Sequence, residues 1–419
     1  MKVEIITVGN EVISGQIVDT NAALLSDAVF SLGATVTRVV TVGDEVETIA
    51  EALREAMARA DLILVTGGLG PTPDDRTPEA AARALEKKLT LNKEYLDTLK
   101  AKFRRWNLQF TSSDEKVAYM PEGAVPLPNP MGMCGFRLDE GSKSIFFFPG
   151  VPRELKALME ETLLPFLRKH RDREKGIVRS FLFKVFGLTE AQVQEIVQGI
   201  TMGENVELAY LPSFPEIHLK AIVRGADEGA VERRLNRCDD AIVERLGIYL
   251  FGRGDEIMEG VVGRLLREKG ASIAVAESCT GGLIAHRITE VSGSSDYFLQ
   301  GVVAYSNQAK EELLGVPHAT LERFGPVSTE TAQQMALGVR EQSGATVGVA
   351  TTGVAGPKGG TAETPVGRVV IALAAEAMLE VKHYDFFGDR HHIKLMASEV
   401  ALDRVRRYLL GHSVHSVTR

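Results

Sequence analysis

The chain has 419 residues, too many for one hydrophobic core, so we expect two or three domains. Apolar residues make up 44% and charged residues 25%, and no apolar run approaches the length of about 20 residues that a membrane span needs. The net charge of −8 opposes general nucleic-acid binding, because phosphate backbones are held by Lys and Arg. The three cysteines lack CxxC spacing, and the N-terminus lacks a signal-peptide core. We therefore expect a cytoplasmic protein that acts on small molecules and has no membrane partner.

Strands and helices alternate over residues 1–170. Strand-like runs occur at Val3 to Val8, Thr35 to Val42, Asp61 to Thr66 and Ile145 to Phe148. Helices are expected to begin at Asp19, Asp44, Pro78 and Pro152. This alternation predicts a doubly wound domain, in which helices cover both faces of a parallel sheet.

The order of elements changes after a charged segment, Arg168 to Lys175, where we place a domain boundary. Residues 175–252 show strand, helix, two strands, helix and strand, which is typical of a small split βαβ unit. Alternation of strand and helix resumes over 257–412, as far as an amphipathic helix near Ala397 to Leu410. We therefore expect an α/β protein of three domains, at 1–170, 175–252 and 257–412.

A serine in the third domain lies where a strand turns into a helix. The run from Ala276 to Gly282, AESCTGG, follows an apolar strand and precedes a helical pattern. Such a turn projects the Ser278 hydroxyl beside unpaired helix N–H groups, which can receive a developing oxyanion. Taken alone, Ser278 or Thr280 is more simply a helix cap.

A lysine downstream is a candidate base for this serine. In AYSNQAK, Ala304 to Lys310, the strand ends and Ser306 or Asn307 can cap a helix whose first turn holds Lys310. The helix dipole and partial burial both lower a lysine pKa there, and a neutral amine can accept a proton. An isolated Lys310 would be read as a solvated surface lysine. His286 is excluded as the base, because it lies about 12 Å from Ser278 along the axis of the same predicted helix, too far to take the proton.

A third motif is the glycine-rich loop Thr351 to Gly360, TTGVAGPKGG, after the strand Thr346 to Ala350. Simple turn chemistry accounts for such a loop. It matches neither the GxxxxGK[ST] nor the GxGxxG pattern, so neither an ATP site nor a dinucleotide site is predicted.

Together with PVG at Pro365 to Gly367, these motifs resemble the C-terminal domain of the competence/damage-inducible protein CinA family, which is similar to nicotinamide mononucleotide deamidases. The resemblance implies hydrolysis of the carboxamide of nicotinamide mononucleotide without a cofactor. It implies Ser278 as nucleophile, Lys310 as general base and Tyr305 as a hydrogen-bonding assistant. Cys279 is the rival nucleophile, and we expect it to be a packing residue. The implied substrate contacts are Thr280, Gly281, Gly282, Asn307, Gly353, Gly356 and, for the phosphate, Arg390.

A second candidate site lies in the first domain, in the loop Gly67 to Thr77 after the strand that ends at Thr66. Ligands bind at the carboxyl ends of strands in open α/β sheets, and glycines let a phosphate approach backbone N–H groups. Paired carboxylates could hold a divalent metal to it. The alternative is a turn with Asp75 or Thr77 as a helix cap, and Asp44 has the same alternative.

This loop, with Gly9 to Glu11, Asp19 to Asn21 and Phe148 to Glu154, resembles the molybdopterin-binding-like N-terminal domain of the CinA family. The resemblance implies hydrolysis of ADP-ribose to AMP and ribose 5-phosphate with magnesium, manganese or cobalt. One segment departs from the family pattern NPxGxAPGF, since residues 129–136 read NPMGMCGF. The implied metal or phosphate ligands are Asp44, Asp74 and Asp75, with Glu11 a weaker candidate, and the implied substrate-binding glycines are Gly67, Gly68 and Gly70.

The middle segment resembles the KH-like insert of the same family. KH modules bind single-stranded nucleic acid through a GXXG loop, and residues 177–251 contain none. This span has eight Lys or Arg and eleven Asp or Glu, a net charge of −3, so a spacer or dimerisation role is favoured over nucleic-acid binding. The resemblance implies a homodimer.

Two classes of function are left open. The first is a bifunctional enzyme that recycles pyridine nucleotides. The second is a nucleotide-binding regulatory protein of competence and DNA damage, without turnover.

Overall fold

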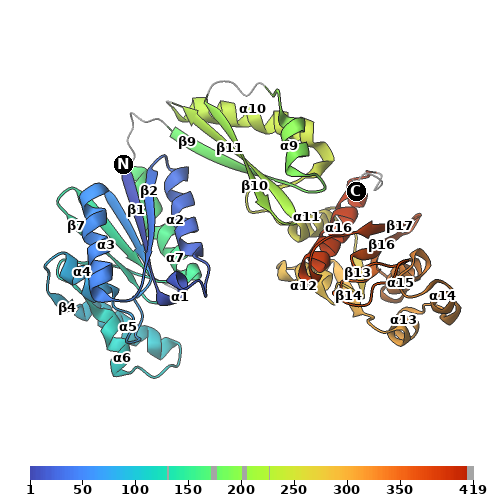
Figure 1. Ribbon diagram of the computed structural model, residues 1–419, viewed down its shortest axis with the longest axis horizontal. Helices are drawn as coiled ribbons and strands as arrows, with labels where there is room; N and C mark the ends of the chain where they lie inside the picture. The colour runs from blue at the N-terminus through green and yellow to red at the C-terminus, as the bar shows by residue number, and fades with distance from the viewer. Residues whose placement is uncertain (130–131, 171–176, 201–204, 226, 413–419) are drawn as a thin grey trace. The chain divides into compact units, whose positions relative to one another are not determined.

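The computed structural model describes residues 1–129, 132–170, 177–200, 205–225 and 227–412 (Figure 1). No helix in these ranges is long and apolar enough to cross a membrane. Contacts between Cα atoms divide the chain into two compact units. Unit 1 comprises Met1–Ser180 and Ile222–Leu235, and unit 2 comprises Phe181–Ala221 and Asn236–Arg419.

A six-stranded sheet forms the centre of the N-terminal domain, in the order β2-β1-β3-β8-β7-β6. The first four strands are parallel, as the sequence predicts, whereas β7 and β6 are antiparallel and were not predicted. The strands are β1 (Lys2–Val8), β2 (Thr35–Val42), β3 (Leu62–Thr66), β6 (Val125–Leu127), β7 (Gly135–Glu140) and β8 (Lys143–Phe148). A separate two-stranded sheet pairs β4 (Leu89–Leu91) with β5 (Tyr119–Pro121).

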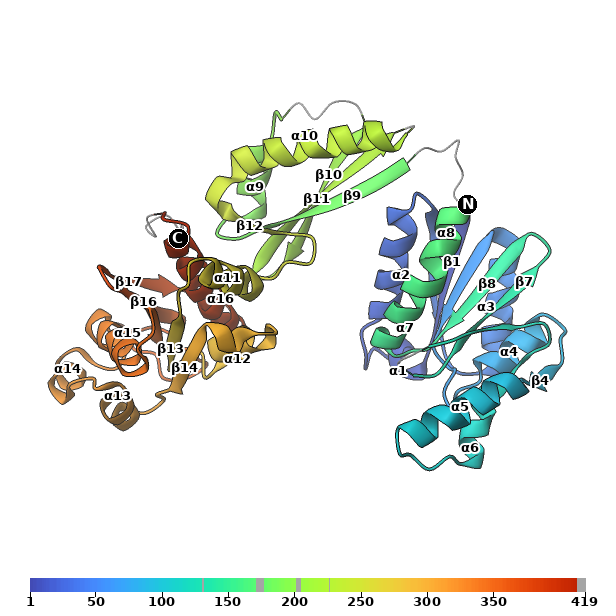
Figure 2. The same ribbon diagram turned by 180° about the vertical axis from the view of Figure 1, so that it is seen from behind.

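Helices cover both faces of this sheet, because the central strands are apolar on both sides. Ile6 and Ile63 belong to the core under α3 (Val46–Arg59), α4 (Thr77–Ala84) and α5 (Lys93–Arg105). Ile5 and Leu64 point the other way, into the core under α2 (Thr20–Ser31), α7 (Pro152–Leu158) and α8 (Leu164–Lys169), which Figure 2 shows from that side. Two short helices, α1 (Asn10–Ile13) and α6 (Ser112–Glu115), lie in loops. The predicted doubly wound fold is confirmed.

The middle segment folds as the predicted order of elements requires. Its sheet has the order β10-β11-β9-β12. The strands are β9 (Ile177–Val185), β10 (Val206–Ser213), β11 (Glu216–Gly225) and β12 (Leu250–Arg253), and the helices are α9 (Glu190–Val197) and α10 (Glu228–Leu246). Most of the predicted boundary segment, residues 171–175, lies outside the described residues.

The C-terminal domain has a five-stranded sheet in the order β14-β13-β15-β16-β17, of which the first three strands are parallel. The strands are β13 (Ile273–Glu277), β14 (Phe298–Val303), β15 (Val347–Gly353), β16 (Arg368–Ala375) and β17 (Met378–Asp385). One face packs on α11 (Met258–Glu268), α12 (Leu283–Glu290) and α16 (Arg390–Leu409), and the other on α13 (Asn307–Leu314), α14 (His318–Phe324) and α15 (Thr329–Ser343). The carboxyl ends of β13, β14 and β15 therefore meet at one edge of the sheet.

Candidate active sites

Ser278 lies in a tight turn between β13 and α12. Its backbone N–H donates to the carbonyl oxygen of Thr351 on β15 over 2.9 Å. Gly281 and Gly282 follow with φ angles of 61° and 88°. Two consecutive residues in the left-handed region favour glycine, because a Cβ is strained there. The predicted strand-to-helix turn is thus present, with Ser278 at the carboxyl end of β13.

Lys310 faces this serine from α13. The predicted cap is confirmed, since the Ser306 side chain accepts a hydrogen bond from the N–H of Ala309. Lys310 Nζ donates to Ser278 Oγ over 3.2 Å and to the carbonyl oxygen of Ala304 over 3.0 Å. Lys310 is only 1% exposed, and its burial lowers the pKa of the amine below the ordinary lysine value. A neutral Lys310 amine can accept the proton of the Ser278 hydroxyl.

Cys279 is a poor rival for Ser278. Its side chain is buried, and burial raises the pKa of the thiol to about 12. A thiol with that pKa is protonated at neutral pH, whereas the thiolate is the nucleophilic form. The structure therefore places Cys279 among the packing residues, in the core cluster under α11 and α16.

The expected oxyanion donors of α12 are already occupied, which corrects the sequence-based expectation. The buried carboxylate of Glu277 accepts hydrogen bonds from the N–H groups of Ile284 and Ala285, over 3.1 and 2.8 Å. Glu277 thereby satisfies the first turn of the helix next to the nucleophile. This role of Glu277 was not predicted, since its carboxylate reaches forward by seven and eight residues. Among the described residues, the N–H of Gly282 has no acceptor and is available to a ligand.

Thr280, an expected substrate contact, is fully buried, and its hydroxyl lies 2.7 Å from the hydroxyl of Thr351. It anchors the turn to β15.

The remaining expected substrate residues surround the turn. Asn307 is exposed at the start of α13. A Cβ at Gly353 would come within 2.5 Å of the carbonyl oxygen of Arg368, and one at Gly356 within 2.5 Å of the Val366 side chain, so both positions need glycine. Gly281 and Gly282 form the turn itself.

Arg390, at the start of α16, joins two of the motifs. Its Nη1 donates to the carbonyl oxygen of Gly356 and its Nη2 to the hydroxyl of Tyr305, each over 2.9 Å. Tyr305 is 61% exposed. The strand-end motif and the glycine-rich loop are thus held together by one guanidinium.

Lys394, one helical turn after Arg390, was not identified from the sequence. Its Nζ lies 3.4 Å from the position that a Cβ on Gly281 would occupy. The spacing of i to i+4 from Arg390 was the available signal, because such residues share a face of the helix.

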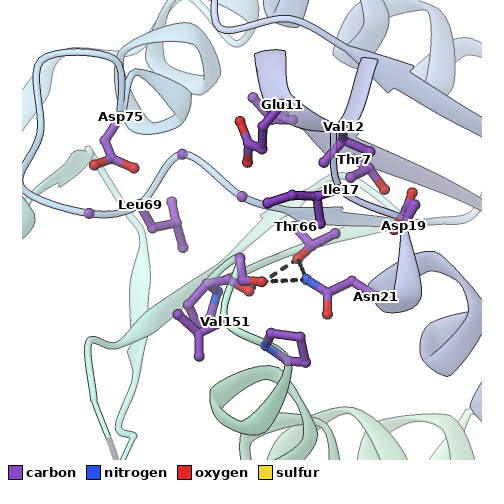
Figure 3. A pocket seen from close by; sticks show the side chains of 18 of the residues that line it. Thr7, Glu11, Val12, Ile17, Asp19, Asn21, Thr66, Leu69, Asp75 and Val151 are labelled. Carbon is purple, nitrogen blue, oxygen red and sulfur yellow. Dashed lines mark hydrogen bonds between the residues drawn. The ribbon is translucent and has the colours of Figure 1, made fainter. Parts of the chain in front are cut away.

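The N-terminal domain has a cavity of about 550 Å³ at the carboxyl ends of its parallel strands (Figure 3). Its lining includes the predicted loop Gly67 to Gly70 and the predicted carboxylates Asp44, Asp74 and Asp75. In Figure 3, Glu11 and Asp75 lie toward one end and Asn21 lies toward the other, where its amide donates to Thr66 Oγ1 and to the carbonyl oxygen of Gly150. The site is therefore a cleft with an acidic end.

The carboxylates at the acidic end repel one another. Burial first, and then the charges of Glu11, Asp74 and Asp75, raise the pKa of Asp44, although the N–H of Asn10 opposes the shift. Asp75 Oδ2 accepts hydrogen bonds from the backbone N–H and the hydroxyl of Thr72. Asp44 is not a helix cap, because α3 begins after Glu45.

A divalent cation fits this acidic end only with help from a ligand. Within the described ranges, no group of three or more His, Cys, Asp or Glu residues could hold a metal ion. Magnesium commonly takes one or two carboxylates together with substrate phosphates and water. Asp44, with Asp74 or Asp75, would be the one or two carboxylate ligands of such an ion.

Close packing explains the glycines of the loop. Gly67 has a φ of 104°, and a Cβ there would clash with the carbonyl oxygen of Val8. Thr77 is the first residue of α4 and not its cap, since its hydroxyl donates to the carbonyl oxygen of Gly67 over 2.9 Å. A Cβ on Gly68 would meet that hydroxyl, and one on Gly70 would lie 2.5 Å from Asp75 Oδ2.

The segment that departs from the family pattern forms part of the wall of this cavity. Pro130 and Met131 lie outside the described residues. Asn129 Nδ2 donates to the carbonyl oxygen of Met133 and to Glu154 Oε2, over 3.0 and 3.3 Å. Glu154 lines the cavity, and burial raises the pKa of its carboxyl group. No role for Glu154 was predicted from the sequence.

Comparison with known proteins agrees with this architecture. Residues 4–169 match the Probable molybdopterin binding domain, 180–252 the Damage-inducible protein CinA KH domain, and 255–409 the CinA C-terminal domain. A CinA-like protein of Geotalea uraniireducens is 43% identical over 420 residues, which cover 100% of both chains. A CinA-like protein of Citrifermentans bemidjiense is 44% identical over 412 residues, 98% of both chains.

Among solved structures, CinA from Thermoplasma acidophilum is 34% identical and covers 39% of this chain and 95% of its own, with a TM-score of 0.37. Full-length relatives above 40% identity, together with matches to all three domains, decide the assignment. The chain belongs to the CinA family.

Proposed function

We propose that the C-terminal domain hydrolyses the carboxamide of nicotinamide mononucleotide to nicotinate mononucleotide and ammonia. The observation that carries this proposal is the buried Ser278–Lys310 pair, with Nζ 3.2 Å from Oγ. A surface lysine and a helix-capping serine have no need of that contact, whereas a nucleophile and its base require it. The choice of this amide rests on the resemblance of the three motifs to nicotinamide mononucleotide deamidases.

The reaction proceeds through an ester on Ser278. As Oγ attacks the carboxamide carbon, Lys310 Nζ takes the hydroxyl proton and the carbonyl oxygen becomes an oxyanion. The tetrahedral intermediate collapses, the C–N bond breaks, and Lys310 returns the proton to the departing ammonia. Lys310 then accepts a proton from the water that attacks the ester carbon. The ester C–O bond breaks, Lys310 returns this proton to Ser278 Oγ, and the carboxylic acid leaves and ionises. The N–H of Gly282 can donate to the oxyanion, and no cofactor takes part.

The N-terminal domain supports a second activity. We propose that its cleft hydrolyses ADP-ribose to AMP and ribose 5-phosphate with magnesium, manganese or cobalt. The specific support is the group of carboxylates at the carboxyl ends of the strands, beside the glycine-rich loop Gly67 to Gly70. A divalent ion held there would supply positive charge to the pyrophosphate. Asp44, with Asp74 or Asp75, would hold it.

Two single variants test both activities at once. Wild-type protein is given nicotinamide mononucleotide, and ammonia is measured; it is separately given ADP-ribose with each metal, and AMP is measured. We expect Ser278→Ala to abolish ammonia release and retain AMP formation, and Asp44→Asn to do the reverse. Each variant is thus the folding control for the other.

The competing function is nucleotide binding without turnover, as in a regulator of competence or DNA damage. Ligand binding by wild-type protein, with no ammonia and no AMP formed, would establish this alternative. The expected homodimer is tested by light scattering on the full chain.

A further inference from the structure

Lys394 is an unpaired cation beside the nucleophile's turn. Its ammonium lies on the side of Gly281 where no side chain projects, 3.4 Å from the site of an absent Cβ. Among the described residues, it has no hydrogen-bond or ion-pair partner. It is half-buried, so part of its hydration is already removed. Such a cation is stabilised by an anionic ligand.

Arg390, by contrast, is engaged with the protein. Nη1 and Nη2, the two ends of its fork, donate to Gly356 and Tyr305. A guanidinium binds phosphate best when two parallel N–H groups are free to point at it. In this arrangement two of the five N–H groups of Arg390 hold the residues around the site, whereas Lys394 keeps all of its donors for a ligand.

We propose that Lys394, and not Arg390, is the residue that binds the anionic group of the amide substrate at the Ser278 site. This inference rests on the proposed deamidase function and adds the residue that contacts the phosphate of its substrate. Arg390 is assigned as a positioning residue for Tyr305 and the loop at Gly356. Both residues come from the first two turns of α16, so one helix delivers the substrate's charge contact and fixes the surrounding loops.

Two substrates that differ only in the phosphate separate these roles. Ammonia release is measured with nicotinamide mononucleotide and with nicotinamide riboside, which lacks the 5′-phosphate. Lys394→Ala should lower kcat/KM for the mononucleotide by about 10- to 100-fold, which is the loss of one charge-assisted hydrogen bond. It should change kcat/KM for the riboside by less than about threefold, because no phosphate contact is lost.

Three further variants sharpen the result. Lys394→Arg should restore most of the preference for the phosphorylated substrate. Arg390→Ala should lower kcat for both substrates alike, since it disturbs Tyr305 and Gly356. Lys269→Ala removes an exposed lysine at the end of α11 and should leave both substrates unaffected. Equal losses with both substrates in Lys394→Ala, or no loss with either, would overturn the proposal, as would loss of the phosphate preference in Arg390→Ala alone.

A binding experiment keeps this inference distinct from the proposed function. Titration calorimetry with the mononucleotide compares Ser278→Ala with the double variant Ser278→Ala/Lys394→Ala. Weaker binding by the double variant supports the phosphate contact even if wild-type protein releases no ammonia. Equal affinity overturns the contact even if the protein is an active deamidase.

Discussion

Replacing Lys310 by Met tests the proposed base most directly. Met fills a similar volume but lacks the amine, which donates to Ser278 Oγ and to the carbonyl oxygen of Ala304. General-base catalysis contributes about 10²- to 10⁴-fold, or roughly 3–5 kcal/mol of transition-state stabilisation. We therefore expect ammonia release from nicotinamide mononucleotide to fall by that factor. Thermal unfolding should occur at the same or a higher temperature, because an apolar side chain avoids the burial of an amine.

The double variant Ser278→Ala/Lys310→Met adds a sharper criterion. A nucleophile and its base act as one unit, so removing the second should cost little once the first is gone. The rates of the double variant and of the slower single variant should agree within a few-fold. A Lys310→Met enzyme that keeps more than about a tenth of the wild-type rate, or a double variant in which the two losses multiply, would refute the assignment of Lys310 as base.

Four other outcomes follow from the same structure. Ammonia release should rise with pH as Lys310 becomes neutral, along a limb below the ordinary lysine pKa, and this limb should vanish in Lys310→Met. Cys279→Ala should retain deamidation, and wild-type activity should resist thiol reagents at neutral pH, because burial raises the thiol pKa to about 12. Gly67→Ala should lower the free energy of unfolding by about 2–5 kcal/mol in urea melts, from backbone strain and the clash with Val8. Glu399 faces Arg287, Glu259 and Glu216, and burial raises the pKa of its carboxyl group from 4.5 to about 7. A carboxyl pKa that folding raises leaves the free energy of unfolding unchanged below pH 4.5. It lowers that free energy by the full amount above pH 7. Wild-type protein should therefore lose on the order of 3 kcal/mol relative to Glu399→Gln as pH rises through that window, and parallel curves would exclude the shift.

The sequence predicts the fold where the pattern is local. Continuous apolar runs such as Ile145 to Phe148 identify buried parallel strands, because both of their faces are covered. The antiparallel strands β7 and β6 escaped prediction, since β6 has only three residues and a strand that short shows no clear alternation of apolar and polar side chains. The hairpin of β16 and β17 was also not predicted, because a run such as Val369 to Ala375 does not reveal the direction of its neighbour.

The candidate site of the C-terminal domain could likewise be predicted only where the pattern is local. Ser278 and Lys310 could be found because each follows a strand, and the ends of neighbouring parallel strands meet. The burial of Thr280 against Thr351 was not foreseen, since it depends on a turn with two left-handed glycines that reverses the chain. Lys394 was not found, although it follows Arg390 at the i to i+4 spacing, because its relation to Gly281 depends on how α16 packs across the sheet.

The packing of α16 connects the fold to the chemistry. Its C-terminal half contains charged residues that an amphipathic pattern would expose, yet Asp403 is completely buried and accepts hydrogen bonds from Arg406 and Arg407. Arg406 also donates to the carbonyl oxygen of Ile248. These pairs with Asp403 lie within α16, whereas Arg404 donates to the carbonyl oxygen of Ile371 on β16 and Glu399 pairs with Arg287 on α12. A shift of the helix along its axis would break the contacts to other elements and leave buried charges unpaired, at a cost of several kcal/mol. The register of α16 is therefore fixed by its contacts with Ile248, Ile371 and Arg287, and that register holds Lys394 beside the Ser278 turn.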